Sequence, residues 1–365
     1  MSWIKSYYAT IIISVILLAL LEIFAKNFLD LGSNNGTYTD DVLGQIYGRD
    51  KISDYRIVLS EQSMGWEYHP LVEYKESPRA GSFVTVSSDN IRCNQNETDS
   101  CQIQHGKGTI WVFGGSTVFG YGVKNNETIP AHLSKLLPNY QVINMGHSSY
   151  YSTLERILFN EKISEGMVPE IAVFIDGLND FYYNKIPSES GASKGISERF
   201  KSPASVSKIS YMKSLAKKSH LVKWLDGKVK GDLNRSQKDD SFLKPNEHLQ
   251  RVVSRLEFNF AARQVIGKLN GIKVLNVLQP VPGYGIGHKT SKVPDHLLRF
   301  GEHVNSAKGY QIIKKQGFKS EVEYLDLSDL AIDTAMFIDT VHYSPEYNQK
   351  IASEISNEIA RIVLK

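Results

Sequence analysis

Residues 109–120 read TIWVFGGSTVFG, and this stretch decides the fold class. Its first part, TIWVF at 109–113, is a short continuous apolar run, which is typical of a parallel strand buried on both faces. Gly114 and Gly115 then allow a tight turn that presents Ser116 at the end of the strand. Free backbone N–H groups at the start of the next segment favour negative charge, so Ser116 is a candidate nucleophile whose own N–H helps to hold an oxyanion. The alternatives are an ordinary turn or a phosphate-binding nest, although no GxxxxGK[ST] motif is present.

Four similar apolar runs follow along the chain. They are QVIN at 141–144, EIAVFI at 170–175, IKVLNVL at 272–278 and VEYLDL at 322–327. Segments with helical spacing separate them, at 129–137, 153–163, 248–269, 295–315 and 345–364. Strands that alternate with helices predict an α/β fold whose parallel five-stranded sheet is covered on both faces. Active sites in such sheets form at the carboxyl ends of the strands.

Polar blocks follow the second and third runs at this predicted edge of the sheet. In INMGHSS, residues 143–149, Gly146 permits close backbone approach, so its N–H is a candidate second oxyanion donor. In IDGLNDF, residues 175–181, the side-chain amide of Asn179 is a candidate third donor. A simple turn glycine and an Asx turn or helix cap are the respective alternatives.

The last block, FIDTVHYSPEYNQ at 337–349, supplies a candidate base. Ser344 followed by Pro345 predicts a helix start, with serine as the cap and proline at the first helical position. His342 then lies on the loop before this helix, and Asp339, three residues earlier, is near enough to accept its ring N–H and direct the other ring nitrogen towards Ser116. The alternative is that the aspartate caps a turn and the histidine is an ordinary surface residue.

These four blocks, GGST, NMG, GLND and DxxH, together resemble the signature blocks of the SGNH, or GDSL-like, hydrolase superfamily over residues 108–365. The resemblance implies a three-layer α/β/α, flavodoxin-like fold with no metal and no organic cofactor. It also implies Ser116 as nucleophile, Gly146 and Asn179 as oxyanion donors, and Asp339 with His342 as the remaining triad members. One departure is Gly115, which stands where the usual GDS motif has an acidic residue.

The first residues predict a membrane anchor. The apolar stretch 7–24 is about long enough to cross a ~30 Å hydrocarbon layer as a helix. A cleaved signal peptide is the alternative, but Ile23 occupies a position where cleavage favours a small residue. The charges flanking this stretch place the amino terminus in the cytoplasm. We therefore expect an anchor at 1–26, a linker and small appended segment at 27–106, and a periplasmic or extracellular catalytic domain at 107–365 of a single-pass cell-membrane protein.

Cysteine usage and charge narrow the function classes further. Cys93 and Cys101, the only cysteines, flank a polar segment and predict a disulfide in an oxidising compartment, with two free thiols as the alternative. The sequence contains no CxxC or HExxH motif, so it does not predict a metal site. A net charge of +3 over 365 residues does not indicate nucleic-acid binding.

A basic insertion at about 187–244 interrupts the alternation of strands and helices. Between positions 194 and 240 it holds 12 Lys and Arg against 5 Asp and Glu. It is interpreted as a lid or a basic surface facing anionic lipid or glycan, or alternatively as a solvated helical excursion.

These features together predict a serine esterase that removes a short acyl group from an extracytoplasmic glycan. The alternatives are an O-acyltransferase acting on an exported polysaccharide and, in a different class, a noncatalytic glycan-binding assembly subunit. Gln279 at the end of the fourth run and Tyr150 after the second are candidate substrate contacts, with a strand-end turn and ring packing as the alternatives.

Overall fold

The structure of the chain is a computed structural model. It describes Leu17, Leu21 and residues 39–62, 65–95, 101–182, 245–285, 304–332 and 336–364. From residue 39 onward the described residues belong to one compact unit. The expected anchor at 1–26, apart from Leu17 and Leu21, and the basic insertion at 187–244 lie outside the described residues. No helix within the described ranges has the length and apolar character needed to cross a membrane.

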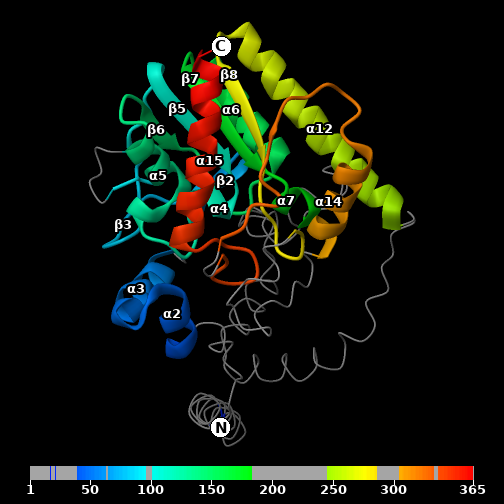
Figure 1. The fold of residues 1–365 in the computed structure, drawn as a ribbon. Helices are drawn as coiled ribbons and strands as arrows, with labels where there is room; N and C mark the ends of the chain where they lie inside the picture. The colour runs from blue at the N-terminus through cyan, green and yellow to red at the C-terminus, as the bar shows by residue number, and fades with distance from the viewer. Residues whose placement is uncertain are drawn as a thin grey trace, which may run out of the picture. The chain divides into compact units, whose positions relative to one another are not determined.

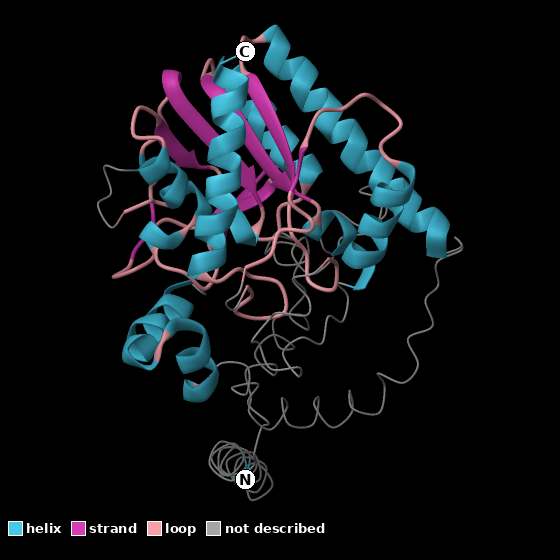
Figure 2. Cartoon of the chain, viewed as in Figure 1, coloured by secondary structure: helices cyan, strands magenta, loops and turns pink. Residues whose placement is uncertain are grey.

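A five-stranded parallel sheet forms the centre of the fold, in the order β6-β5-β7-β8-β9 (Figures 1 and 2). The strands are β5 (Gly106–Gly114), β6 (Gln141–Asn144), β7 (Pro169–Asp176), β8 (Lys273–Leu278) and β9 (Leu325–Asp326). The predicted α/β fold with a parallel five-stranded sheet is thereby confirmed. Strand β9 is shorter than the run expected at 322–327.

The strand order determines where a site forms. The chain runs from β5 outward to β6, crosses back over β5 to β7, and continues outward in the opposite direction. Such a reversal leaves a crevice beyond the carboxyl ends of the two central strands. Gly114 pairs with Ile175 in the register of β5 and β7, so the two strands end at nearly the same level. The segments that follow β5 and β7 therefore meet.

Helices cover both faces of the sheet. They are α5 (Ile129–Leu136), α6 (Ser152–Ser164), α12 (Pro245–Leu269), α14 (Val304–Gln316) and α15 (Pro345–Leu364). Helices α5 and α15 pack together on one face, and α12 packs against α6 and α14 on the other (Figure 1). The arrangement has three layers, α/β/α.

The side chains of β5 alternate between the two helical layers, as the pleat of a strand requires. Ile110 and Val112 belong to the apolar cluster that includes residues of α5 and α15. Phe113 points the other way and meets Phe159 of α6 at a ring-centroid distance of 5.6 Å. The strand is buried on both faces, which explains why its sequence is a continuous apolar run rather than an alternating one.

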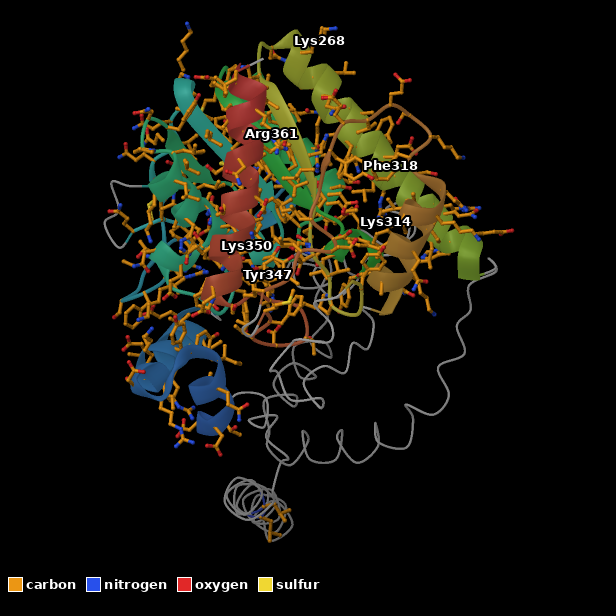
Figure 3. The ribbon with its side chains drawn as sticks, in the orientation of Figure 1. Lys268, Lys314, Phe318, Tyr347, Lys350 and Arg361 are labelled. Atoms are coloured by element: carbon orange, nitrogen blue, oxygen red, sulfur yellow. A yellow bond between two sulfur atoms is a disulfide. The ribbon has the colours of Figure 1, made fainter. Side chains whose placement is uncertain are left out.

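Helix α15 begins as its sequence predicts. Ser344 caps it, since the Tyr347 N–H donates to the Ser344 hydroxyl over 3.2 Å, and Pro345 occupies the first helical position. One side of the helix is buried, including Tyr347, whereas Lys350 and Arg361 carry ion pairs with neighbouring glutamates (Figure 3).

The segment before the main domain contains helices as well as strands. Helices α2 (Asp40–Tyr47) and α3 (Ile52–Gln62) precede two antiparallel pairs, β1 (Trp66–His69) with β2 (Glu73–Glu76) and β3 (Arg79–Ala80) with β4 (Thr85–Val86). From the sequence this segment was expected only as a linker and small appended segment, and no helix was predicted in it. A helical signal is visible afterwards, because Leu43, Ile46 and Tyr47 are buried at i, i+3 and i+4.

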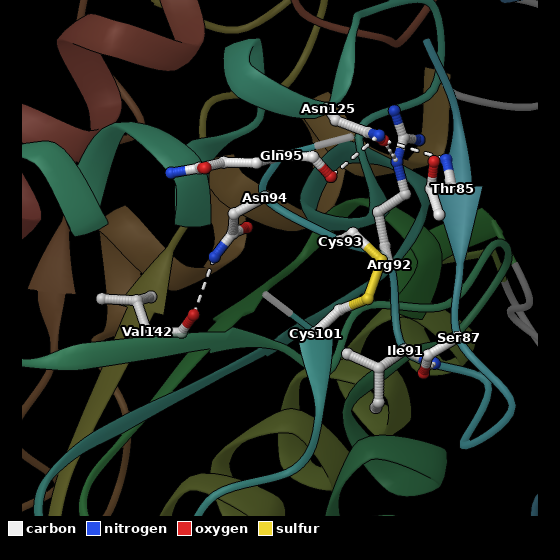
Figure 4. Close-up of a disulfide and its surroundings, with 10 residues drawn as sticks. All are labelled: Thr85, Ser87, Ile91, Arg92, Cys93, Asn94, Gln95, Cys101, Asn125 and Val142. Atoms are coloured by element: carbon white, nitrogen blue, oxygen red, sulfur yellow. Dashed lines mark hydrogen bonds between the residues drawn. A yellow bond between two sulfur atoms is a disulfide. The ribbon is translucent and has the colours of Figure 1, made fainter. Parts of the chain in front are cut away.

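A disulfide joins Cys93 and Cys101, as the sequence analysis expected (Figure 4). Next to it, Asn94 donates its side-chain amide to the Val142 carbonyl of β6 over 2.7 Å. The cysteines and Asn94 are buried, and the Asn94 hydrogen bond attaches this end of the appended segment to the edge of the sheet.

Candidate active site

Ser116 is the first residue of a one-turn helix, α4 (Ser116–Phe119), which starts directly after β5 and Gly115. The N–H groups of Val118 and Phe119 both donate to the Gly115 carbonyl, over 3.1 and 3.0 Å. The N–H of Ser116 itself has no hydrogen-bond acceptor in the part of the chain that the structure describes. This serine therefore presents both a hydroxyl and an unused backbone donor at the crevice.

The loop at 336–344 is a tight hairpin that brings Asp339 and His342 together. The Ile338 N–H donates to the His342 carbonyl over 2.8 Å, and the Ser344 N–H donates to the Met336 carbonyl over 2.9 Å. Asp339 Oδ1 accepts the N–H groups of Val341 and His342, each over 2.8 Å. The loop's own backbone therefore holds one carboxylate oxygen, and the other oxygen faces the imidazole.

The three expected triad residues lie in one hydrogen-bonded chain. Asp339 Oδ2 is 2.7 Å from His342 Nδ1, and His342 Nε2 is 2.9 Å from Ser116 Oγ. An ionised carboxylate only accepts hydrogen bonds, so Nδ1 carries the proton and Nε2 is the acceptor that faces the serine hydroxyl. This is the tautomer needed for a histidine that takes a proton from Ser116.

The electrostatics of Asp339 favour that assignment. Burial alone would raise the pKa of its carboxyl, but the adjacent His342 imidazole and the two backbone N–H donors outweigh burial and hold this pKa below its ordinary value. Asp339 is therefore ionised at neutral pH and stabilises a positive charge on the imidazole.

Asn179 lies beside the nucleophile, on the short helix α7 (Leu178–Tyr182) after β7. Its amide nitrogen donates to the Tyr150 carbonyl over 2.7 Å, which uses one of its two hydrogens. A Cβ built on Gly115 would overlap with this nitrogen and lie 2.9 Å from the Tyr150 carbonyl oxygen. The absence of a side chain at Gly115 therefore makes room for Asn179.

Gly146 does not meet the expectation of a second backbone donor. Its N–H donates to Asn144 Oδ1 over 3.0 Å, and its Cα packs against the backbone of Val118 and Phe119. Three residues further on, Ser149 has a φ of 66°, a conformation that favours glycine, and among the described residues its N–H has no acceptor. This could not be predicted from the sequence, because a serine occupies a position whose left-handed backbone conformation favours glycine.

The two candidate substrate contacts line a small pocket together with Gly115 and Asn179, although little of either side chain is exposed. Gln279 is 2% exposed and its side-chain oxygen accepts the Thr117 hydroxyl over 3.2 Å. Tyr150 is 1% exposed and its hydroxyl donates to the Tyr74 carbonyl. The Tyr150 hydroxyl and the Gln279 side-chain oxygen are thus used inside the protein, and contact of either residue with a substrate stays a prediction.

His147 is not an alternative base. Burial and the nearby Lys75 lower its pKa to about 3, and it is 1% exposed. Within the described residues, no group of three or more His, Cys, Asp or Glu side chains is arranged to hold a metal ion.

Tyr121 is a neighbour of the triad that the sequence analysis did not single out. Its ring lies over the His342 imidazole, with centroids 4.3 Å apart and planes tilted by 31°. Its backbone N–H donates to the Ser116 carbonyl over 2.9 Å. The aromatic residue is therefore held next to both the nucleophile and the histidine.

The comparisons with known proteins give structural similarity at low sequence identity. No family model and no curated protein matches this sequence. Among solved structures, Est24, a carbohydrate acetylesterase from Sinorhizobium meliloti, is similar with a TM-score of 0.39 and 13% identity, covering 70% of this chain and 100% of that one. Axe2, an acetylxylan esterase from Geobacillus stearothermophilus, studied as a catalytic mutant, is similar with a TM-score of 0.37 and 12% identity, covering 71% of this chain and 96% of that one.

A member of the lipolytic protein G-D-S-L family from Veillonella parvula DSM 2008 is similar with a TM-score of 0.36 and 11% identity, over 69% of this chain and 97% of that one. At such TM-scores and identities these similarities assign neither an activity nor a substrate to this chain.

Proposed function

We propose that this protein is a serine esterase that cleaves its substrate through an acyl-enzyme on Ser116. The observation that carries the proposal is the continuous chain from Asp339 to His342 to Ser116, with contacts of 2.7 and 2.9 Å. Each atom in this chain has the hydrogen-bond role that nucleophilic catalysis by serine requires.

In the first half-reaction Ser116 Oγ attacks the carbonyl carbon of the ester while His342 Nε2 takes the hydroxyl proton. The tetrahedral intermediate collapses, the bond to the alcohol oxygen breaks, and the imidazolium gives its proton to the departing alcohol. Water then repeats the sequence on the acyl-enzyme and releases the acid. Asp339 stays ionised throughout and holds the imidazole in its productive orientation.

The oxyanion needs donors that the folded protein has not already used. We assign this role to the Ser116 N–H, which has no acceptor in the described residues, and to the second amide hydrogen of Asn179. Ser149 is the residue before Tyr150, whose carbonyl orients Asn179, and its N–H replaces that of Gly146 as the candidate third donor. Each such donor contributes on the order of 10² to 10³ in rate.

The proposed substrate is a short acyl ester on a glycan outside the cytoplasm. The apolar stretch at 7–24 predicts an anchor, and the Cys93–Cys101 disulfide suits an oxidising compartment. A C-terminal fusion to alkaline phosphatase, which is active only outside the cytoplasm, tests the location. Phosphatase activity in the membrane fraction supports it, and an inactive fusion contradicts it.

The activity is tested with the full-length chain purified in mild detergent. p-Nitrophenyl acetate, butyrate and octanoate rank acyl length, and a panel of acetylated polysaccharides ranks acceptors by acetate release. Ser116→Ala and His342→Ala are expected to lower kcat by on the order of 10⁴ or more. Ser148→Ala is the matched control, because only backbone atoms of Ser148 make hydrogen bonds in the described structure.

A fluorophosphonate probe gives a readout that does not depend on the choice of ester. Its phosphorus forms a bond to Ser116 Oγ and fluoride leaves, so labelling reports an activated serine. Labelling lost in Ser116→Ala and kept in Ser148→Ala supports the proposal; equal labelling of both variants refutes it. Adding a glycan acceptor then measures partition, since acylated acceptor in place of free acid identifies acyl transfer instead of hydrolysis.

A further inference from the structure

Side chains from the amino-terminal segment hold the loop that follows the nucleophile helix, residues 120–123. Gln62, the last residue of α3, donates its amide hydrogen to the Gly120 carbonyl over 2.9 Å and accepts the Gly122 N–H over 2.6 Å. Tyr47, the last residue of α2, donates its hydroxyl to the Gly122 carbonyl over 2.8 Å. All three bonds are buried, so water does not compete for them.

Arg92 completes this attachment from the other side. Its buried guanidinium donates to the carbonyls of Phe119 and Gly120 over 3.3 Å each and to the Val123 carbonyl over 2.9 Å. Its burial lowers the pKa to about 9, which leaves it charged at neutral pH. Three side chains far away in the sequence therefore satisfy the backbone of one short loop.

The loop has little freedom to adopt another path. Gly122 has a φ of 80°, and a Cβ built there would overlap with Ile338, the neighbour of Asp339. The residue between the two clamped glycines is Tyr121, whose ring lies over the His342 imidazole. The loop thus packs against Ile338 and His342, which lie on either side of Asp339 in the sequence.

We infer that Tyr121 is a positioning residue for His342, and that α2 and α3 hold it in place through Gln62 and Tyr47. This inference rests on the proposed function, because it concerns the histidine of the triad. An aromatic face against an imidazole restricts rotation of the ring and is attracted to the imidazolium formed when Ser116 loses its proton. The segment between the predicted anchor and the catalytic domain is then part of the catalytic apparatus rather than a spacer.

The kinetic test compares Tyr121→Leu and Tyr121→Phe in the full-length chain. We expect Tyr121→Leu to lower kcat about tenfold with KM changed less than about twofold, since an aromatic–cation contact of this kind is worth on the order of a tenfold factor. Tyr121→Phe keeps the ring and is expected to retain most of kcat. If Tyr121→Phe loses as much as Tyr121→Leu, the hydroxyl is what matters and the inference is overturned.

Gln62→Leu tests the clamp without changing the site, and Gln45→Leu on exposed α2 surface is its matched control. Gln62→Leu should lower kcat as Tyr121→Leu does, and the double variant should cost little more than either single one. Additive losses would mean that Gln62 acts independently of Tyr121 and would overturn the inference. Tyr47→Phe, which removes one hydrogen bond, is the milder variant if Gln62→Leu does not fold.

A spectroscopic signature separates this inference from the proposed function. The Tyr121 ring current shifts the ring-proton resonances of His342, visible by NMR with selectively labelled histidine and assigned with His342→Gln. The shift should disappear in Tyr121→Leu, weaken in Gln62→Leu and persist in Gln45→Leu. If the resonances follow this pattern but the wild type neither hydrolyses esters nor reacts with the fluorophosphonate, the proposed function is refuted. The positioning of His342 by Tyr121 is then still supported. If the wild type is labelled by the fluorophosphonate but its His342 resonances do not change in Tyr121→Leu, only the positioning role of Tyr121 is refuted.

Discussion

Replacement of Gly115 by alanine should disable the oxyanion side of the site and leave the triad intact. An ordinary Cβ contact is 3.4–4 Å, whereas a Cβ at this position overlaps with Asn179 Nδ2 and lies 2.9 Å from the Tyr150 carbonyl oxygen. The amide must therefore retreat by about 1 Å, a displacement that costs on the order of 10² in rate when the displaced group acts on the transition state. Losing the donor entirely costs on the order of 10² to 10³, so we expect kcat of Gly115→Ala to fall within that range.

A double-mutant cycle with Asn179→Ala distinguishes this mechanism from general damage. Asn179→Ala alone should lower kcat by on the order of 10² to 10³. In that background the new Cβ no longer meets the amide, so Gly115→Ala should add only the cost of crowding Tyr150, about tenfold or less. The assay is kcat for p-nitrophenyl acetate, with thermal unfolding to confirm that each variant is folded. Equal losses from Gly115→Ala in both backgrounds would refute the reasoning.

Three further results follow from the same structure. Asp339→Asn should lower kcat by on the order of 10⁴, measured by steady-state kinetics, because the amide favours the wrong imidazole tautomer. The folded state lowers the pKa of Asp339, so the unfolding free energy of the wild type relative to Asp339→Asn should be largest above about pH 4 and shrink in denaturant titrations as pH falls further. Replacing Cys93 and Cys101 by serine should cost about 2.5 kcal/mol of unfolding free energy, from the entropy of a loop with a sequence separation of 8, while kcat of the folded enzyme is unchanged.

Each of these three has a contrary outcome. An Asp339→Asn variant with near wild-type kcat would show that the carboxylate does not set the tautomer. A stability difference that grows on acidification would mean that the carboxyl is protonated more readily in the folded state than in the unfolded one. Reduced kcat in the folded cysteine variant would show that the disulfide shapes the site as well as the edge of the sheet.

Most of the sheet could be predicted because the central strands β5 and β7 are buried on both faces over most of their length. TIWVF and EIAVFI became β5 and β7 with only small changes at their ends, and QVIN became β6 without change. Helices α2 and α3 were not predicted because they are short, and the polar residues around them obscure the period of Leu43, Ile46 and Tyr47. Their helical state depends on packing against the main domain, which no local pattern reports.

The candidate site could also be predicted only in part. Spacing along the chain was enough to place Asp339 beside His342, and the ends of parallel strands were enough to bring Ser116 near them. Spacing says nothing about which polar groups the interior has already used. Asn144 Oδ1 accepts the N–H of Gly146, so one expected oxyanion donor is already used, and Thr117 donates to the side-chain oxygen of Gln279. The Gly146–Asn144 bond is local, whereas the Thr117–Gln279 bond joins residues far apart in the sequence and becomes visible only when the partners are placed in space.

Because α4 has a single turn, Ser116 and Tyr121 both lie next to His342 although only four residues separate them. The N–H groups of Gly120 and Tyr121 both donate to the Ser116 carbonyl over 2.9 Å, and Gly120 adopts a φ of 90° that ends the helix at once. A longer helix would carry the aromatic ring away from the crevice, whereas this reversal returns it to within 4.3 Å of the His342 ring. The carbonyl oxygen of Ser116 therefore helps to hold the Tyr121 ring near both Ser116 and His342. Any side chain at Gly120 is expected to disturb both together, because its Cβ would overlap with Thr128.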